Sequence, residues 1–117
     1  MPQRIEKVQK LAREVLGETI QTLKDPRIGF ATVTAVRMSA DLRHARVFVS
    51  VLADEPGRSA TMDGLRSATP YLRSEMGRQM RLKYLPELIF ELDPGPETAE
   101  RLEAVLKRIR ETEGREQ

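Results

Sequence analysis

The 117-residue sequence contains no cysteine and one histidine, and aromatic residues make up only 4% of it. Without cysteine there can be no disulfide framework and no thiolate metal site. The polar start, residues 1–7, lacks the apolar region of a secretory signal, and the longest apolar run, Val47 to Ala53, is far too short to span a bilayer. These absences predict a soluble cytoplasmic protein that has no membrane contact.

Familiar catalytic patterns are also missing. The sequence has no Walker-type phosphate loop, no Gly-x-Ser-x-Gly and no zinc-ligand spacing. His44 falls in a predicted hairpin loop, where a surface or RNA-contacting role fits better than general-base chemistry. Asp25, Asp41 and Asp93 fall at predicted turns, where carboxylates cap backbone N–H groups more often than they bind metal. We therefore predict a non-enzyme with no catalytic residues, no metal and no cofactor.

Hydrophobic spacing predicts the order of helices and strands. Apolar residues repeat at helical spacing over residues 5–23, which predicts a long first helix with one buried stripe. Two segments rich in Val, Thr and Phe, residues 31–39 and 45–53, predict a hairpin of two strands. Leu88, Phe90 and Leu92 alternate in a third strand that begins after Pro86, and a last helix begins at about Glu97.

A broken helix is predicted between the second and third strands. Met62, Leu65, Ala68, Leu72 and Met76 keep helical spacing across the break at Ala68-Thr69-Pro70, so both halves should cover one core face. Pro70 lacks a backbone N–H and disfavours helical angles at Thr69, which predicts a new helix with Thr69 as its cap. Its free N–H groups could bind phosphate, or the kink could serve packing alone.

Charge divides unevenly along the chain. Residues 1–85 contain 15 Lys+Arg and 9 Asp+Glu, whereas residues 86–117 contain 5 and 9. A nucleic-acid-binding face with an acidic rear would produce this asymmetry. Arginine supplies 15 of the 20 basic residues, which suits phosphate binding but can equally reflect genomic composition or heat adaptation.

The candidate RNA contacts come from the polar face of the first helix, the hairpin and the second half of the kinked helix: Arg4, Lys7, Lys10, Arg43, Arg46, Arg73, Arg78 and Arg81. On the first helix an ordinary solvated face is the alternative. We expect phosphate contacts to dominate. Stacking on aromatic rings is not expected to dominate, because the three phenylalanines lie in or beside strand patterns typical of a core.

The predicted architecture is an α+β sandwich, in which helices cover one face of a three-stranded sheet. The chain resembles the ribosome-binding factor A family over nearly its whole length. The resemblance rests on short motifs in a specific order and spacing: Lys24-Asp25-Pro26-Arg27-Ile28-Gly29, Asp41-Leu42 with Ala45, Leu72-Arg73, and Leu82 with Pro86-Glu87-Leu88, Phe90 and Asp93.

The resemblance implies a KH-like (type II) domain with a mixed sheet, over residues 1–110, followed by a flexible charged tail, 111–117. It implies binding to 16S rRNA in free or immature small (30S) ribosomal subunits, late subunit maturation and 16S rRNA processing, and a role in cold adaptation. Other assembly factors, such as GTPases, are implied as further partners. In that family an Ala-x-Gly kink replaces the Gly-x-x-Gly loop of other KH domains. This chain retains Ala68 but has Pro70 where glycine is expected.

Two other classes of function stay open from the residues alone. A protein-docking adaptor without direct RNA binding would use the sheet edge or the acidic final helix to engage a partner. An enzyme would need a pocket with converging titratable groups, and no pattern in the sequence indicates one. A monomer is the default expectation, because the chain is one small domain without a coiled-coil heptad.

Overall fold

The structure, a computed structural model, describes residues 2–93, so the predicted last helix and the charged tail lie outside the described residues. The elements follow the predicted order: α1 Pro2–Gln21, β1 Phe30–Met38, β2 His44–Leu52, α2 Glu55–Ser67, α3 Thr69–Gln79 and β3 Glu87–Leu92. Each predicted strand lies within one or two residues of the observed one. Within residues 2–93 no helix is long and apolar enough to cross a bilayer.

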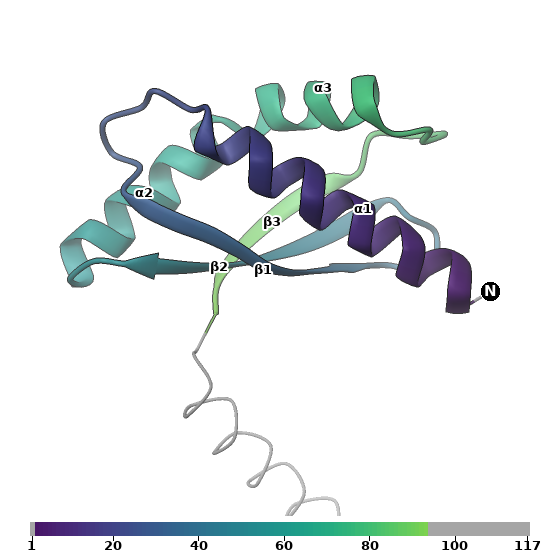
Figure 1. The fold of residues 1–117 in the computed structure, drawn as a ribbon, viewed down its shortest axis with the longest axis horizontal. Helices are drawn as coiled ribbons and strands as arrows, with labels where there is room; N and C mark the ends of the chain where they lie inside the picture. Colours follow the sequence, from purple (N-terminus) through teal and green to yellow (C-terminus); the bar gives the residue numbers. More distant parts are fainter. Residues whose placement is uncertain (1, 94–117) are drawn as a thin grey trace, which may run out of the picture.

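The three strands form one mixed sheet with β2 in the middle (Figure 1). β1 and β2 pair antiparallel as the predicted hairpin, and β3 runs parallel to β2. A parallel neighbour needs a crossover connection, and the α2–α3 pair supplies it. The register of β1 shifts between Val33 and Ala35, where the Thr34 hydroxyl donates to the carbonyl of Phe48 at 3.2 Å. This irregularity is a β-bulge, which adds local twist to the strand.

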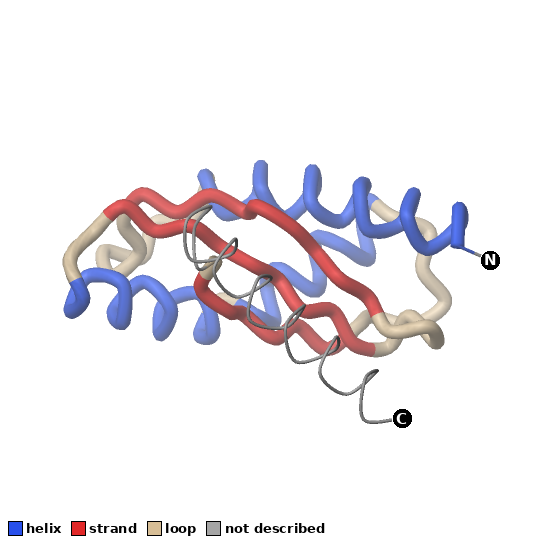
Figure 2. The backbone as a smooth tube through the Cα atoms, turned by 90° about the horizontal axis from the view of Figure 1, so that it is seen from below, coloured by secondary structure: helices blue, strands red, loops and turns tan. Residues whose placement is uncertain are grey.

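The three described helices lie on the same face of the sheet (Figure 2). Val47 and Val49 of β2 are fully buried beneath them, and Leu16 of α1 with Leu72 of α3 is likewise fully buried. The alternation predicted for β2 is therefore confirmed. Burial of each such side chain contributes about 1.5–3 kcal/mol, so this layer supplies most of the driving force for folding.

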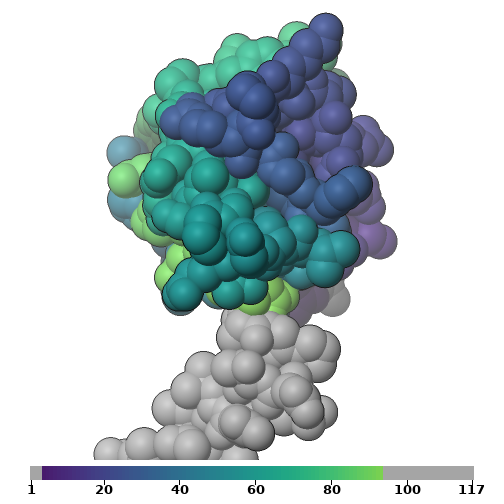
Figure 3. All heavy atoms as spheres, turned by 90° about the vertical axis from the view of Figure 1, so that its left-hand side faces the viewer, coloured from purple at the N-terminus to yellow at the C-terminus, as the bar shows by residue number. Residues whose placement is uncertain are grey.

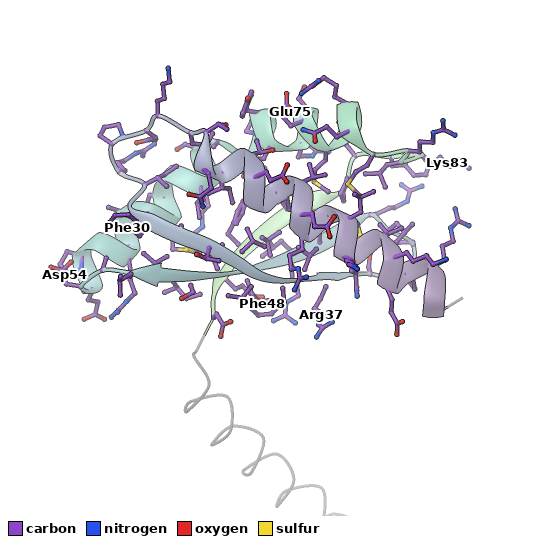
Figure 4. All side chains as sticks on the ribbon, viewed as in Figure 1. Phe30, Arg37, Phe48, Asp54, Glu75 and Lys83 are labelled. Atoms are coloured by element: carbon purple, nitrogen blue, oxygen red, sulfur yellow. The ribbon has the colours of Figure 1, made fainter. Side chains whose placement is uncertain are left out.

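Two of the three phenylalanines contradict the prediction that they are core residues. Only Phe90 is buried, at 4% exposure, whereas Phe30 is 81% exposed and Phe48 is partly exposed. Phe48 and Arg37 point from the sheet away from the helices (Figure 4). The physical reason is the two-residue period of a strand: the small residues Ala31 and Val47 occupy the inward positions, which sends their Phe neighbours outward.

The α1–β1 loop packs onto α2 at one end of the molecule, where Figure 3 shows the loop (blue) against the helix (teal). The buried Thr61 hydroxyl accepts from the N–H of Gly29 at 3.1 Å and donates to the carbonyl of Arg27 at 3.3 Å. Asp25 accepts from the N–H of Arg27 at 2.9 Å, so its predicted capping role is confirmed. Gly64 of α2 leaves room for Ile28 of the loop.

The helix break is confirmed, but its predicted cap is wrong. α2 passes into α3 through Ala68, whose ψ of −3° departs from the helical value of about −42° and turns the chain. The Thr69 hydroxyl does not cap α3, because Ala68 takes the N-cap position and Thr69 is already the first residue of the helix. This hydroxyl donates back to the carbonyl of Leu65 in α2 at 3.3 Å. Met62 and Met76, on either side of the break, are both buried on the same core, as predicted. The phosphate-binding role of this kink stays a prediction.

Candidate nucleic-acid interface

Three chain segments meet at the end of the molecule where α1 begins (Figure 1). The start of α1, the β1–β2 loop and the α3–β3 loop enclose a hollow of about 320 Å³, here called the basic pocket. Its lining includes the cations Arg4, Arg81 and Lys83 and one carboxylate, Asp41. Lys83 lies at this same end in Figure 4. The three cations form no hydrogen bond or ion pair with any residue of the described chain, so their donors are available to an anion.

The Asp41 carboxylate forms its hydrogen bonds within the β1–β2 loop and none with the cations of the basic pocket. It accepts from the Ser39 hydroxyl at 2.6 Å and from the N–H of Arg43 at 3.0 Å. These hydrogen bonds, the Ser39 one first, hold the pKa of Asp41 below its ordinary value. Leu42, at the turn, has a φ of 61°, and its N–H donates to the carbonyl of Ser39 at 2.9 Å. The loop therefore has a defined shape, and the turn-capping role predicted for Asp41 is confirmed.

Arg43 leaves this loop and lies over the ring of Tyr84, with its guanidinium carbon 4.2 Å from the ring centroid. The Nζ of Lys83 lies 5.5 Å from the same centroid. Tyr84 lines the basic pocket and also a shallow depression that Arg43 and Arg73 border. Tyr84, a residue that is 45% exposed, therefore lies between two hollows lined by cations. Both cations are attracted to the negative face of the aromatic ring.

Arg73, a predicted RNA contact, holds the α3–β3 loop in place. Its Nε donates to the carbonyl of Pro86 at 2.9 Å, and its Nη2 donates to the carbonyl of Leu85 at 3.0 Å. The planar guanidinium thus bridges α3 and the residues just before β3. Arg73 is accordingly assigned a structural role beside the basic pocket.

Two other predicted contacts are paired with carboxylates. Arg78 forms an ion pair with Glu75 at 2.6 Å on α3, and the hydrogen bond lowers the pKa of Glu75 (labelled in Figure 4). Arg46 pairs with Glu91 at 2.7 Å on the sheet face opposite the helices. Phosphate binding by either arginine would have to compete with its carboxylate. Neither Arg46 nor Arg78 lines the basic pocket.

The remaining predicted contacts lie along α1. Lys10 borders a separate groove between α1 and β1, together with Arg13 and Arg37. Lys7 is exposed on α1. Of the predicted contacts, Arg4 and Arg81 line the basic pocket, and Arg43 borders the neighbouring depression. The predicted contacts did not include Lys83 or Tyr84. The signal that could have found them is a tyrosine next to a lysine in the basic segment that follows α3.

The kink lies away from the basic pocket. α3 has 11 residues, so about 16 Å of helix separates Ala68 from the α3–β3 loop. Residues 2–93 contain no group of three His, Asp or Glu side chains placed to hold a metal ion. His44 contributes its Nδ1 to a contact with Glu87 at 3.2 Å at the protein surface.

The element order, the mixed sheet and the kinked helix pair define a small α+β domain of the KH-like, type II kind. A family model described as ribosome-binding factor A matches residues 4–106 of the chain. The chain therefore belongs to the ribosome-binding factor A family.

Individual relatives agree with this assignment. The ribosome-binding factor A of Halothermothrix orenii is 45% identical over 103 residues, which are 88% of this chain and 84% of that protein. A solution structure of a Thermotoga maritima protein, named as a putative ribosome binding factor A, is 33% identical, with a TM-score of 0.71 over 80% of this chain and 91% of that one. A homology model of Thermus thermophilus ribosome binding factor A, fitted into a cryo-EM map of its complex with the 30S subunit, is 33% identical, with a TM-score of 0.62 over 73% of this chain and 90% of that one.

Proposed function

We propose that this protein is a ribosome assembly factor that binds the small (30S) subunit through 16S rRNA and promotes late maturation of that subunit, including 16S rRNA processing and growth in the cold. Membership of the family and the 30S complex of the Thermus thermophilus relative support the proposal. The protein would bind an immature subunit reversibly in the cytoplasm and leave it once the subunit is complete.

The observation that carries the proposal is the basic pocket. Arg4 from α1 and Arg81 with Lys83 from the α3–β3 loop converge there, although Arg4 and Arg81 are far apart in the sequence. Phosphate contacts to such cations supply affinity and orientation with little reading of base sequence. A folded rRNA surface, which presents closely spaced phosphates in a fixed shape, is the partner that suits this arrangement.

Co-sedimentation of the full chain with small subunits, large subunits and protein-free rRNA across a salt series tests the proposal. We expect selective binding to small subunits that weakens steeply as salt rises. Reversal of two charges, Arg4→Glu with Arg81→Glu, should weaken binding and reduce the log–log salt slope by roughly 1.4–1.8, because each lost phosphate contact contributes about 0.7–0.9.

The matched control is Lys24→Glu with Arg66→Glu, which changes the net charge equally. Lys24 is exposed in the α1–β1 loop, and the ion pair of Arg66 within residues 2–93 is with Asp63, at 3.3 Å on α2. This control should bind nearly as the unaltered protein does. Equal loss in both double variants would mean that net charge matters and the pocket does not. A shallow salt response without subunit selectivity would instead favour a protein-docking adaptor.

Two further points belong to this proposal. The protein would act as a monomer, because residues 2–93 already enclose a core of their own that includes all three helices. Release from the subunit would be driven by another assembly factor, such as a GTPase. Sedimentation of the purified protein tests the first point, and displacement from loaded subunits by candidate factors tests the second.

A further inference from the structure

The guanidinium of Arg43 lies over an aromatic ring and has no polar partner in the described chain. Arg27, Arg46 and Arg78 each pair with a carboxylate. Arg73 donates to backbone carbonyls. Arg43 instead lies over Tyr84 at 4.2 Å and makes no side-chain hydrogen bond or ion pair within residues 2–93. The N–H donors of this guanidinium are therefore available to a ligand, while one face of its plane packs on the Tyr84 ring.

The backbone on both sides of this contact is fixed. The carbonyl of Arg43 accepts from the N–H of Glu87 at 2.8 Å, which ties the two loops together. The Ser39 hydroxyl accepts from the N–H of His44 at 3.1 Å, and Arg73 holds the carbonyls just after Tyr84. A side chain held on such a frame loses little conformational freedom when it binds a ligand, and this preorganisation increases affinity.

A guanidinium backed by an aromatic ring is a stacking surface for a nucleobase. Unpaired bases in RNA stack on arginine planes and aromatic rings, whereas bases inside a duplex have both faces covered by their neighbours. The adjoining basic pocket, at about 320 Å³, falls within the size range of small-ligand sites, roughly 300–1,000 Å³. Its cations Arg4, Arg81 and Lys83 lie where a phosphate of the same strand can be bound.

We propose that Arg43 and Tyr84 form a stacking site for one unpaired nucleobase of RNA, whose flanking phosphates bind Arg4, Arg81 and Lys83. This inference rests on the proposed RNA-binding function and adds to it a preference for an unstacked base. It also adds an aromatic stacking contact, whereas the sequence led us to expect that phosphate contacts dominate. An acidic peptide would engage the same cations but would gain nothing from the stacked plane.

The experiment measures binding of the full chain to a labelled hexaadenylate RNA, to the same hexamer with abasic sugars, and to a duplex of equal length. The key variant is Arg43→Lys, which keeps the charge and removes the plane. We expect Arg43→Lys and Tyr84→Leu each to weaken hexaadenylate binding about tenfold, within the range measured for loss of a stacked base. Neither should change binding of the abasic hexamer, and the salt slope should stay the same because no phosphate contact is lost.

Tyr84→Phe keeps the ring and should bind nearly as the unaltered protein does. Tyr71→Leu is the matched control, because Tyr71 is also about half exposed, at 50%, but lies on α3 outside both hollows. Thermal unfolding of each variant establishes that it is folded. If Tyr84→Leu loses its fold, Arg43→Lys decides the question alone.

The stacking site would be overturned if Arg43→Lys and Tyr84→Leu lost equal affinity for the abasic and base-bearing hexamers, or lost no affinity for either. Equal affinity for hexaglutamate and hexaadenylate, with no effect of Arg43→Lys, would overturn it too. The same variants are then tested for co-sedimentation with small subunits. Selective subunit binding that survives while the stacking test fails leaves the rRNA proposal standing, whereas absence of selective subunit binding by the unaltered protein refutes the proposed function itself.

Discussion

Gly64 and Gly17 allow the same substitution to be compared in two packing environments. A Cβ built on Gly64 of α2 would lie 2.6 Å from Cγ1 of Ile28, a separation that real Cβ contacts do not show. A Cβ on Gly17 of α1 would meet nothing within 4 Å. Both glycines lie inside helices, so alanine should favour each helix by about 1 kcal/mol through backbone propensity.

The difference between the two variants therefore measures the contact with Ile28. Gly17→Ala should stabilise the protein by about 0.5–1 kcal/mol and raise Tm by up to roughly 5 °C for a chain of this size. Gly64→Ala gains the same propensity, but it pushes the α1–β1 loop outward, at an overpacking cost of about 1–3 kcal/mol. We expect Gly64→Ala to be less stable than Gly17→Ala by about 1–3 kcal/mol.

Urea unfolding followed by circular dichroism measures both free energies of unfolding. A double-mutant cycle with Ile28→Ala then isolates the contact, because removal of Cγ1 should relieve most of the clash and produce a favourable coupling between positions 28 and 64. If Gly64→Ala stabilises the protein as much as Gly17→Ala, the loop yields freely and our account of its packing is wrong.

Two further predictions concern polar contacts. Arg73→Met removes both hydrogen bonds from α3 to the loop before β3, and it should lower the free energy of unfolding in urea by about 1–3 kcal/mol. An unchanged unfolding midpoint would show that Pro86 and its neighbours hold the loop without Arg73. The hydrogen bond from Arg46 lowers the pKa of Glu91, so this pair contributes stability that is present above the unfolded-state pKa of glutamate and is lost as pH falls through the lower folded-state value. Arg46→Met should raise the pKa of Glu91 in a carboxyl NMR titration, and an unshifted titration would contradict the pairing.

Much of the fold could be predicted from local pattern. The 3.6-residue spacing of Leu16 and its neighbours predicts α1, and the alternation about Val47 and Val49 predicts β2, because each period must bring apolar side chains to one face. Pro70 predicts the break between α2 and α3, since it has no N–H to donate. The predicted cap at Thr69 is wrong by one residue, because Ala68 takes the N-cap position and Thr69 already begins α3.

The candidate site could be predicted only in part. Clustered arginines in the sequence indicate a basic surface, but their partners decide which of them are available. Arg46 meets Glu91, a residue 45 positions away, through the parallel pairing of β2 and β3. Arg78 meets Glu75 one helical turn earlier, a pairing that the spacing itself favours.

The sequence by itself determined the elements, the burial of one face of each, and the excess of positive charge before Pro86. Only the tertiary structure decided that the start of α1 and two loops meet at one end, and that Arg43 lies on Tyr84 there. The reason is physical: periodicity acts within a few residues along the chain, whereas the basic pocket depends on the relative placement of three segments by strand register and helix packing. Charge alone could not reveal which cations converge, because a chain must fold before distant residues share a surface.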